Sequence, residues 1–325
     1  MANEIFFSAR CSALESNLLT FDELSKLASA NSVQDCIKLL NAHKIMQGER
    51  CQSYRDFLDV VDNDEKRFLE FLKRNNPKEE LAKFFLLEYD YFNLECVFLH
   101  KRMGYEIPEN LHEGTMTIDA IKRAVLNQKY EILSPRMQNC LQYLDGLFDR
   151  NEATGFLVDT AFKKSFYEEE LVIAKASVHL QKILDFQIDS SNIELALRFR
   201  DVEVFDKIRL TGGTLEDEFL EKLCKDPFNK ILVDTQFMTY SVAIKLIVQA
   251  LLKNQTLYKF EYMQDCFPVT YLNKIRFQTD KDIPYIKYCF LKKCELTNLR
   301  IIFEGLIAGR EAKVICDDIR RVYDK

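Results

Sequence analysis

The sequence predicts an all-α fold, and two observations predict it. Only nine glycines and six prolines interrupt the 325 residues, and apolar residues recur at spacings of three and four, which is the period of an amphipathic helix. Alternating apolar and polar residues, the pattern of a strand, are scarce. The helical spacing is clear at Leu14, Leu18 and Leu19, at Phe68, Phe71 and Leu72, and at Leu171, Ile173, Ala174 and Val178.

Prolines and a glycine pair divide the chain into helices of ordinary length. The residue before a proline disfavours the helical backbone conformation, and a glycine pair favours a turn. The run FYEEE at 166–170 is predicted to open a helix, because carboxylates interact favourably with a helix N-terminus. We expect helices to end at or near Asn75-Asn76-Pro77, Ile107-Pro108, Ser134-Pro135, Gly212-Gly213, Asp226-Pro227, Phe267-Pro268 and Ile283-Pro284.

Length, charge and hydropathy restrict the class of protein. At about 150 residues per domain, a chain of 325 residues allows two or three domains. A net charge of −6 provides no basic field for phosphates, so nucleic acid is not expected as the main partner. The N-terminus MANEIFFSAR lacks the regions of a signal peptide, and the most apolar stretch, 241–252, is interrupted by Lys245. We expect a cytoplasmic chain that associates with a membrane only peripherally.

The sequence offers no catalytic, cofactor-binding or metal-binding residues. The ten cysteines form no C-x-x-C pair, and His43, His100, His112 and His179 lack both zinc-finger spacing and a triad arrangement. The glycine pair in LTGGT at 210–214 lacks the order of a phosphate-binding loop and is interpreted as a turn. We therefore predict no catalytic site, no cofactor and no metal, and expect the cysteines to be free thiols.

Two distant segments resemble each other. Residues 84–104 (FFLLEYDYFNLECVFLHKRMG) align with 289–309 at an offset of 205, and each is predicted to form a helix, a turn and a second helix. A weaker middle copy is assigned to LALRFRDVEVFDKIRLTGG, with Asp201 at the acidic position. The matched pairs of the outer copies are Phe85 with Phe290, Leu86 with Leu291, Asp90 with Glu295, Asn93 with Asn298, Leu94 with Leu299, Val97 with Ile302, Phe98 with Phe303 and Gly104 with Gly309.

A second repeated module lies between these segments. GTMTIDAIKRAVLNQKYEIL begins at Gly114 and GTLEDEFLEKLCKDPFNKIL begins at Gly213, an offset of 99, and residues 20–40 resemble both. The offsets predict three diverged helical units, at 1–112, 113–212 and 213–325. We expect the three units to superpose about a pseudo-threefold axis.

The repeated polar residues are interpreted as structural. Asp90 is expected to cap a second helix by accepting backbone N–H bonds, with Asn93 in the first turn of that helix. In the last copy Thr297 could cap in place of Glu295. Gly104 and its counterpart Gly309 suit the left-handed residue that ends a helix. The apolar positions that follow, Leu94, Val97 and Phe98 and in the last copy Leu299 and Ile302, are predicted to form a buried stripe.

The combination of these segments resembles a known family. The N-terminal SARCSALESNLLT, the segments EYDYFNLECVFLHKRMG and KKCELTNLRIIFEGLIAG, and the GT-headed modules between them resemble the C subunit of V-type (archaeal-type) ATPases and ATP synthases, the counterpart of the eukaryotic d subunit. The resemblance runs from about residue 5 to about residue 323, and the terminal segment is its most specific part.

The resemblance implies a funnel of three similar helical domains without a catalytic role. Such a protein is a socket that joins the central stalk to the membrane proteolipid ring, and it transmits torque for proton or sodium transport or for ATP synthesis. Its partners would be the stalk subunits and the ring, and the isolated chain is expected to be a monomer. A helical scaffold or adaptor unrelated to rotary ATPases is the alternative, and an enzyme with widely scattered catalytic residues is a further one.

Overall fold

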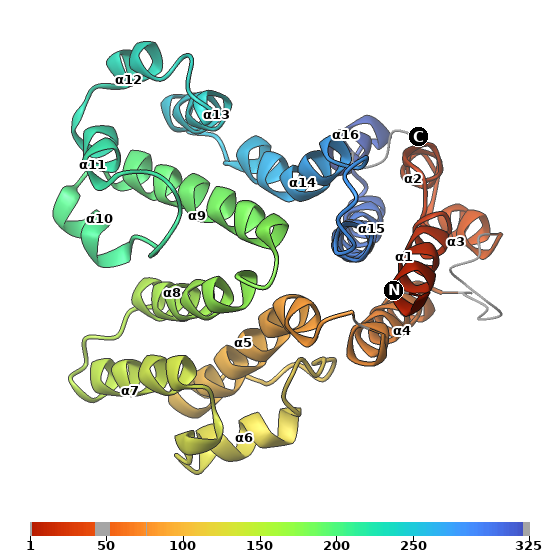
Figure 1. Ribbon diagram of the computed structural model, residues 1–325, viewed down its shortest axis with the longest axis horizontal. Helices are drawn as coiled ribbons and strands as arrows, with labels where there is room; N and C mark the ends of the chain where they lie inside the picture. Colours follow the sequence, from red (N-terminus) through yellow and green to blue (C-terminus); the bar gives the residue numbers. More distant parts are fainter. Residues whose placement is uncertain (1, 43–52, 76, 321–325) are drawn as a thin grey trace. The chain divides into compact units, whose positions relative to one another are not determined.

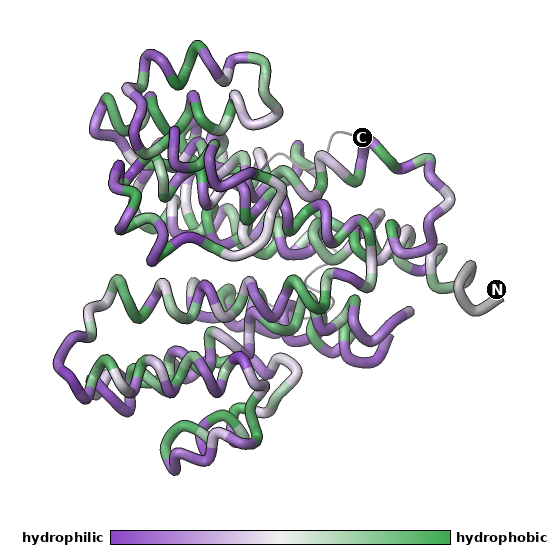
Figure 2. Tube along the Cα trace, turned by 60° about the vertical axis from the view of Figure 1, so that its left-hand side comes forward, coloured by the Kyte–Doolittle hydropathy of each residue, from purple (hydrophilic) through white to green (hydrophobic). Residues whose placement is uncertain are grey.

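The computed structural model describes residues 2–42, 53–75 and 77–320 (Figure 1). These residues form sixteen α-helices and a short 3-10 helix, and this part of the chain contains no strand. The predicted all-α fold class is therefore confirmed. Hydrophobic and hydrophilic residues alternate in short runs along the Cα trace (Figure 2), as expected of amphipathic helices that each bury one face.

The contacts between residues divide the chain into two compact units. Unit 1 joins the two ends of the chain, 1–77 and 262–325, and unit 2 comprises 78–261. The described helices of unit 1 are α1 (Ala2–Glu15), α2 (Phe21–Ala28), α3 (Val33–Asn41), α4 (Tyr54–Arg74), α15 (Ile283–Ile307) and α16 (Ala312–Asp318), together with most of α14 (Tyr258–Lys274). The three units that the sequence predicts at 1–112, 113–212 and 213–325 stay a prediction.

Unit 2 contains the remaining helices. Its core contains apolar side chains from five consecutive elements, of which the first is a long helix. Leu94, Val97 and Phe98 of that helix are fully buried, as predicted. The elements of unit 2 are α5 (Glu79–Met103), α6 (Ile118–Leu126), η2 (Tyr130–Ile132), α7 (Pro135–Asp149), α8 (Gly155–Ala174), α9 (Val178–Phe199), α10 (Val202–Ile208), α11 (Asp217–Lys225), α12 (Phe228–Asp234) and α13 (Ser241–Leu252).

One long helix organises unit 1. Five other helices of the unit, α1, α2, α3, α4 and α16, pack against α15. Leu299 and Ile302 of α15 are fully buried, as the sequence predicts. Because α2 comes from the N-terminal segment and α15 from the C-terminal one, the two chain ends share a single core.

Local signals set several helix ends, and three of these, at Ser134, Gly104 and Gly309, lie where the sequence expects them. Thr20 and Ser53 each begin a helix with a reciprocal capping box. Ser134 caps α7, whose first residue is a proline. At the other end, Gly104 terminates α5 with a φ of 74°, and Gly309 follows α15 with a φ of 64°. The prediction that these two glycines are left-handed is confirmed.

The predicted turns at 90–93 and 295–298 are wrong. α5 and α15 are continuous helices of 25 residues each, and the acidic and asparagine positions lie within them. Asp90 therefore caps no second helix, and neither Glu295 nor Thr297 begins one. The reason is tertiary, because buried polar groups within a helix are tolerated when other segments supply their hydrogen-bond partners.

Two further expectations about helix ends are wrong. Helix α14 runs through Pro268, because residues on both sides of the proline, Phe260 and Leu272 among them, are anchored by burial. The acidic run at 166–170 lies in the second half of α8 and does not open a helix. Carboxylates of this run interact with side chains from other helices and loops, and not with the N-terminus of their own helix. Arg136 pairs with Glu168, while Tyr91 (2.8 Å) and Ser134 (2.6 Å) donate hydroxyl hydrogen bonds to Glu169.

No helix in the described part of the chain combines the length and hydropathy that a membrane crossing requires.

Candidate functional site

The first of three buried junctions joins the long helix α5 to the loop before α6. Asp90 is fully buried and accepts hydrogen bonds from the backbone N–H of Thr115 (2.9 Å) and of Met116 (3.0 Å), and from the Thr115 hydroxyl. Asn93, one turn further along α5, donates to the His112 carbonyl at 2.8 Å. One helix thereby fixes the loop that leads into the next helix.

A second junction repeats this arrangement in unit 2. Asp189 of α9 accepts from the backbone N–H of Thr214 (2.9 Å) and of Leu215 (3.1 Å), and from the Thr214 hydroxyl (2.6 Å). The Tyr240 hydroxyl adds a fourth donor at 2.6 Å. The loop held here leads into α11, just as the first one leads into α6.

The third junction connects the two ends of the chain within unit 1. Glu295 of α15 accepts from the backbone N–H of Leu19 at 2.7 Å, in the loop before α2. Leu18 stands where the other two loops have threonine, so a hydroxyl donor is missing. Lys292 supplies the replacement, since its ammonium group donates to Glu295 at 2.6 Å.

The asparagine contacts repeat together with the carboxylates. Asn192 exchanges two hydrogen bonds with Leu210, at 2.8 and 3.0 Å. Asn298 likewise exchanges two with Arg320, at 2.8 and 3.2 Å. Asn93 donates one. In each junction the asparagine lies three residues after the acid and holds backbone that is distant in the sequence.

These contacts correct one assignment of the sequence analysis. The outer pairs, Asp90 with Glu295 and Asn93 with Asn298, play the same part in the structure. The middle copy is wrongly assigned, because the residue equivalent to Asp90 is Asp189, at the module offset of 99. Asp201 instead caps α10 through the Val204 N–H. The sequence could have located Asp189, because adding the offset of 99 between the glycine modules to position 90 gives position 189.

Burial and hydrogen bonding have opposite effects on the pKa of Asp90. Burial raises the pKa of Asp90, and bonds from Thr115 and Met116 partly offset that rise, so the pKa stays above its ordinary value. Burial and the hydrogen bond to Asp189 raise the pKa of Tyr240. The Tyr240 hydroxyl therefore stays protonated at neutral pH and remains a donor.

Glycine is required where the loops of the first two junctions cross the long helices. A Cβ atom on Gly114 would lie 2.4 Å from the Leu86 carbonyl oxygen. A Cβ atom on Gly213 would lie 2.2 Å from a carboxylate oxygen of Asp189, and Gly213 also has a φ of +81°. Both glycines belong to the GT-headed modules that the sequence singles out. Gly212 and Gly213 both have a positive φ and lie in a loop, where the sequence expects a turn.

Replacing Gly213 with alanine should destabilise unit 2. We expect a loss of about 2–4 kcal/mol in the free energy of unfolding, because the side chain meets the Asp189 carboxylate in a left-handed backbone conformation. Urea unfolding followed by circular dichroism measures it. Gly155→Ala is the matched control, since a Cβ atom there has no atom within 4 Å; it should cause no loss. Equal stability of the two variants would contradict the role given to the loop crossing.

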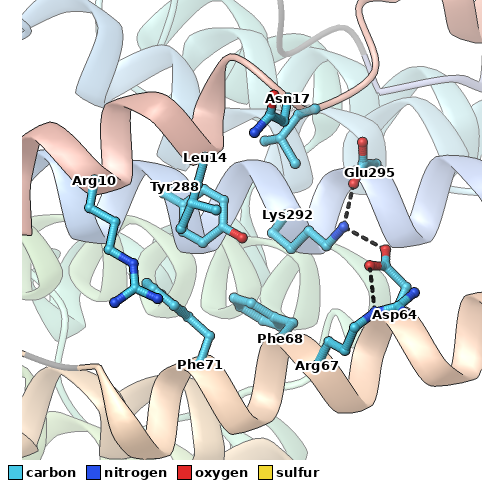
Figure 3. A pocket seen from close by; sticks show the side chains of 11 residues that line it. Arg10, Leu14, Asn17, Asp64, Arg67, Phe68, Phe71, Tyr288, Lys292 and Glu295 are labelled. Carbon is cyan, nitrogen blue, oxygen red and sulfur yellow. Dashed lines mark hydrogen bonds and ion pairs between the residues drawn. The ribbon is translucent and has the colours of Figure 1, made fainter. Parts of the chain in front are cut away.

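A cavity of about 290 Å³ lies beside the third junction, between α1, α4 and α15 (Figure 3). Lys292 lies at one end of it and donates to Asp64 of α4 at 2.5 Å as well as to Glu295. Aromatic side chains form a wall, with Tyr288 edge-on to Phe71 at 5.2 Å between ring centroids. Ionic and aromatic groups therefore face the same hollow, which is open to solvent on one side.

Lys292 remains charged despite its burial. Its side chain is only 7% exposed. Burial lowers the pKa of Lys292, but Glu295 and Asp64 raise it further, so the pKa lies above its ordinary value of 10.5. The cluster of Asp64, Lys292 and Glu295 is thus a buried ion-pair network, which ties α4 to α15.

The residues that the sequence analysis weighed for chemistry do not assemble. His100 has Nδ1 2.7 Å from the Tyr105 carbonyl oxygen, His112 packs edge-on against Tyr89, and His179 is buried. His43 and Cys51 lie outside the described residues. The nine described cysteines form no disulfide bond with one another. Within the described ranges, no three His, Cys, Asp or Glu side chains are grouped to hold a metal ion.

Comparison with known families gives a match over most of the chain. The model of the ATP synthase (C/AC39) subunit family matches residues 7–316. That span includes the carboxylates and asparagines of all three junctions. No curated protein matches the chain significantly.

Proposed function

The chain belongs to the ATP synthase (C/AC39) subunit family, a family of V-type ATPase subunits, and we propose that it is the non-catalytic socket of the rotor. In this role it joins the central stalk to the membrane proteolipid ring and transmits torque between them. Torque is used for ATP-driven transport of protons or sodium ions, or for ATP synthesis. The alternative of a scaffold unrelated to rotary ATPases is removed by the family membership.

The family match over residues 7–316 carries the proposal. The three junctions support it, because a part that transmits torque must resist deformation. At each junction a buried acid and an asparagine fix a loop to a long helix, and at the third they fix the two chain ends to each other. The proposal assigns no chemical step to this chain. ATP chemistry belongs to subunits that carry phosphate-binding loops.

The proposed partners are the stalk subunits and the proteolipid ring, and the chain would lie at the cytoplasmic face of the membrane. Purified chain is expected to be a monomer and to co-elute with the central stalk subunits in size-exclusion chromatography at low and at moderate salt. Each component run alone provides the reference elution volume. Separate elution at both salt concentrations would argue strongly against the socket role.

A further inference from the structure

Two polar groups that line the cavity beside the third junction have unused hydrogen-bonding capacity. The Tyr288 hydroxyl points into the cavity in Figure 3, the residue is only 6% exposed, and no hydrogen bond joins this hydroxyl to another described residue. An ammonium group has three N–H donors, and two of those of Lys292 are used within the described part of the chain, by Asp64 and Glu295. Both groups are therefore available to a ligand that enters the cavity.

The cationic side chains that line this cavity outnumber the anionic ones. Arg10, Arg67 and Lys292 face two carboxylates, Asp64 and Glu295. Lys292 lies between the carboxylates, and Arg67 is 3.9 Å from Asp64. Arg10 is paired with no carboxylate among the described residues; its guanidinium lies 5.9 Å from the Phe71 ring centroid and donates to Asn75. The mouth of the cavity therefore favours a negative charge.

The remaining surface of the cavity is apolar and partly flat. Phe68, Phe71 and Tyr288 provide aromatic faces and edges, and Leu14 and Leu18 provide aliphatic contacts. A volume of about 290 Å³ lies just below the usual range for small-molecule sites, which begins at about 300 Å³. Apolar walls with a few convergent polar groups are the usual composition of such sites.

We propose that this cavity binds a small organic anion with a planar apolar body. The body would lie against Phe68, Phe71 and Leu14. The anionic group would interact with the Arg10 guanidinium, and a polar substituent could bond to the Tyr288 hydroxyl or to the free N–H of Lys292. Bound there, the ligand would contact α1, α4 and α15 together, next to the contact that joins the two ends of the chain.

The test uses the full chain and 2-naphthoate as the probe, with 6-hydroxy-2-naphthoate as a second probe that adds a polar substituent. Saturable binding of both is expected in ligand-observed NMR titrations, with the hydroxylated probe bound more tightly. Tyr288→Phe should weaken the hydroxylated probe about 5–10-fold, which corresponds to one hydrogen bond. Arg10→Gln should weaken both anions several-fold, and Leu14→Trp, which fills the cavity, should abolish binding.

Matched controls separate binding from folding. Tyr285→Phe removes a hydroxyl from the same helix outside the cavity lining, and Arg55→Gln removes an exposed guanidinium of α4; neither should change the affinity. The neutral analogue 2-naphthalenemethanol should bind more weakly, and Arg10→Gln should not affect it. Thermal unfolding of each variant checks the fold, and if Leu14→Trp does not fold, Tyr288→Phe and Arg10→Gln still decide the question.

Three results would overturn the inference. The first is that neither probe shows saturable binding. The second is that the neutral analogue binds as tightly as 2-naphthoate. The third is that Tyr288→Phe and Arg10→Gln leave the affinities for the probes unchanged. The measurement needs neither the stalk nor the ring. If no probe bound, the proposed socket role would be unaffected. If the stalk subunits failed to co-elute with the chain, the binding result would be unaffected.

Discussion

Removal of this chain from the assembled enzyme is expected to abolish ATP-driven ion transport while ATP hydrolysis by the soluble heads continues. The proposed socket is the mechanical link between stalk and ring, so without it rotation of the stalk cannot drive the ring. Hydrolysis itself requires phosphate-binding loops and a positioned Mg²⁺, and this sequence offers no such loop. Transport and hydrolysis would be measured in parallel on reconstituted vesicles with and without the chain.

The control for this experiment is readdition of the purified chain, which should restore transport. Loss of hydrolysis by the isolated heads would mean that the chain takes part in catalysis, and the mechanical role would then be abandoned. Transport that persists without the chain would also contradict the proposal, because a second link between stalk and ring would have to exist.

Replacement of Lys292 with methionine is expected to cost about 3–5 kcal/mol in the free energy of unfolding. Methionine keeps most of the volume of the side chain but leaves Asp64 and Glu295 buried close to each other without a cation. Removing one partner of a buried ion pair is costly for this reason, even where replacing the whole pair would not be. Denaturant unfolding of the full chain measures the change.

Lys66→Met is the matched control, because Lys66 pairs with Asp62 on the same helix α4 at the surface, with its side chain 54% exposed. Exposed pairs contribute at most about 1 kcal/mol. If both lysine variants lost equally little stability, the network of Lys292 would be no more important than a surface pair.

The pH dependence gives an independent check on the same lysine. The pKa of Lys292 in the folded chain lies above its ordinary value of 10.5, because Glu295 and Asp64 outweigh the effect of burial. The folded state therefore holds this proton more tightly than the unfolded state does. The stabilisation is fully present below pH 10.5 and is lost as the pH rises through the folded value. The stability difference between wild type and Lys292→Met should stay constant from neutral pH to about pH 10.5 and shrink above that pH.

The sequence by itself determined the fold class, many of the helix ends and the family. Periodic apolar residues predicted helices and the buried stripe of Leu94, Val97 and Phe98, because burial of one helix face leaves its period in the sequence. Capping residues and left-handed glycines are also local signals, which is why Gly104 and Gly309 were placed correctly. The pairing of Asp90 with Glu295 was visible because both copies keep the acid and the asparagine three residues later.

Only the tertiary structure decided what those polar residues do. An acid within an apolar helical pattern indicates a cap when only its neighbours are considered, and the predicted turns followed from that. Asp90 instead takes its donors from residues 25 and 26 positions later, and Glu295 from one 276 positions earlier. The hydrogen-bond donors to a buried carboxylate come from whichever segment packs over it. The spacing of apolar residues along the helix does not predict which segment that is. Pro268 within α14 has the same explanation, because burial on both sides of the proline outweighs its local preference.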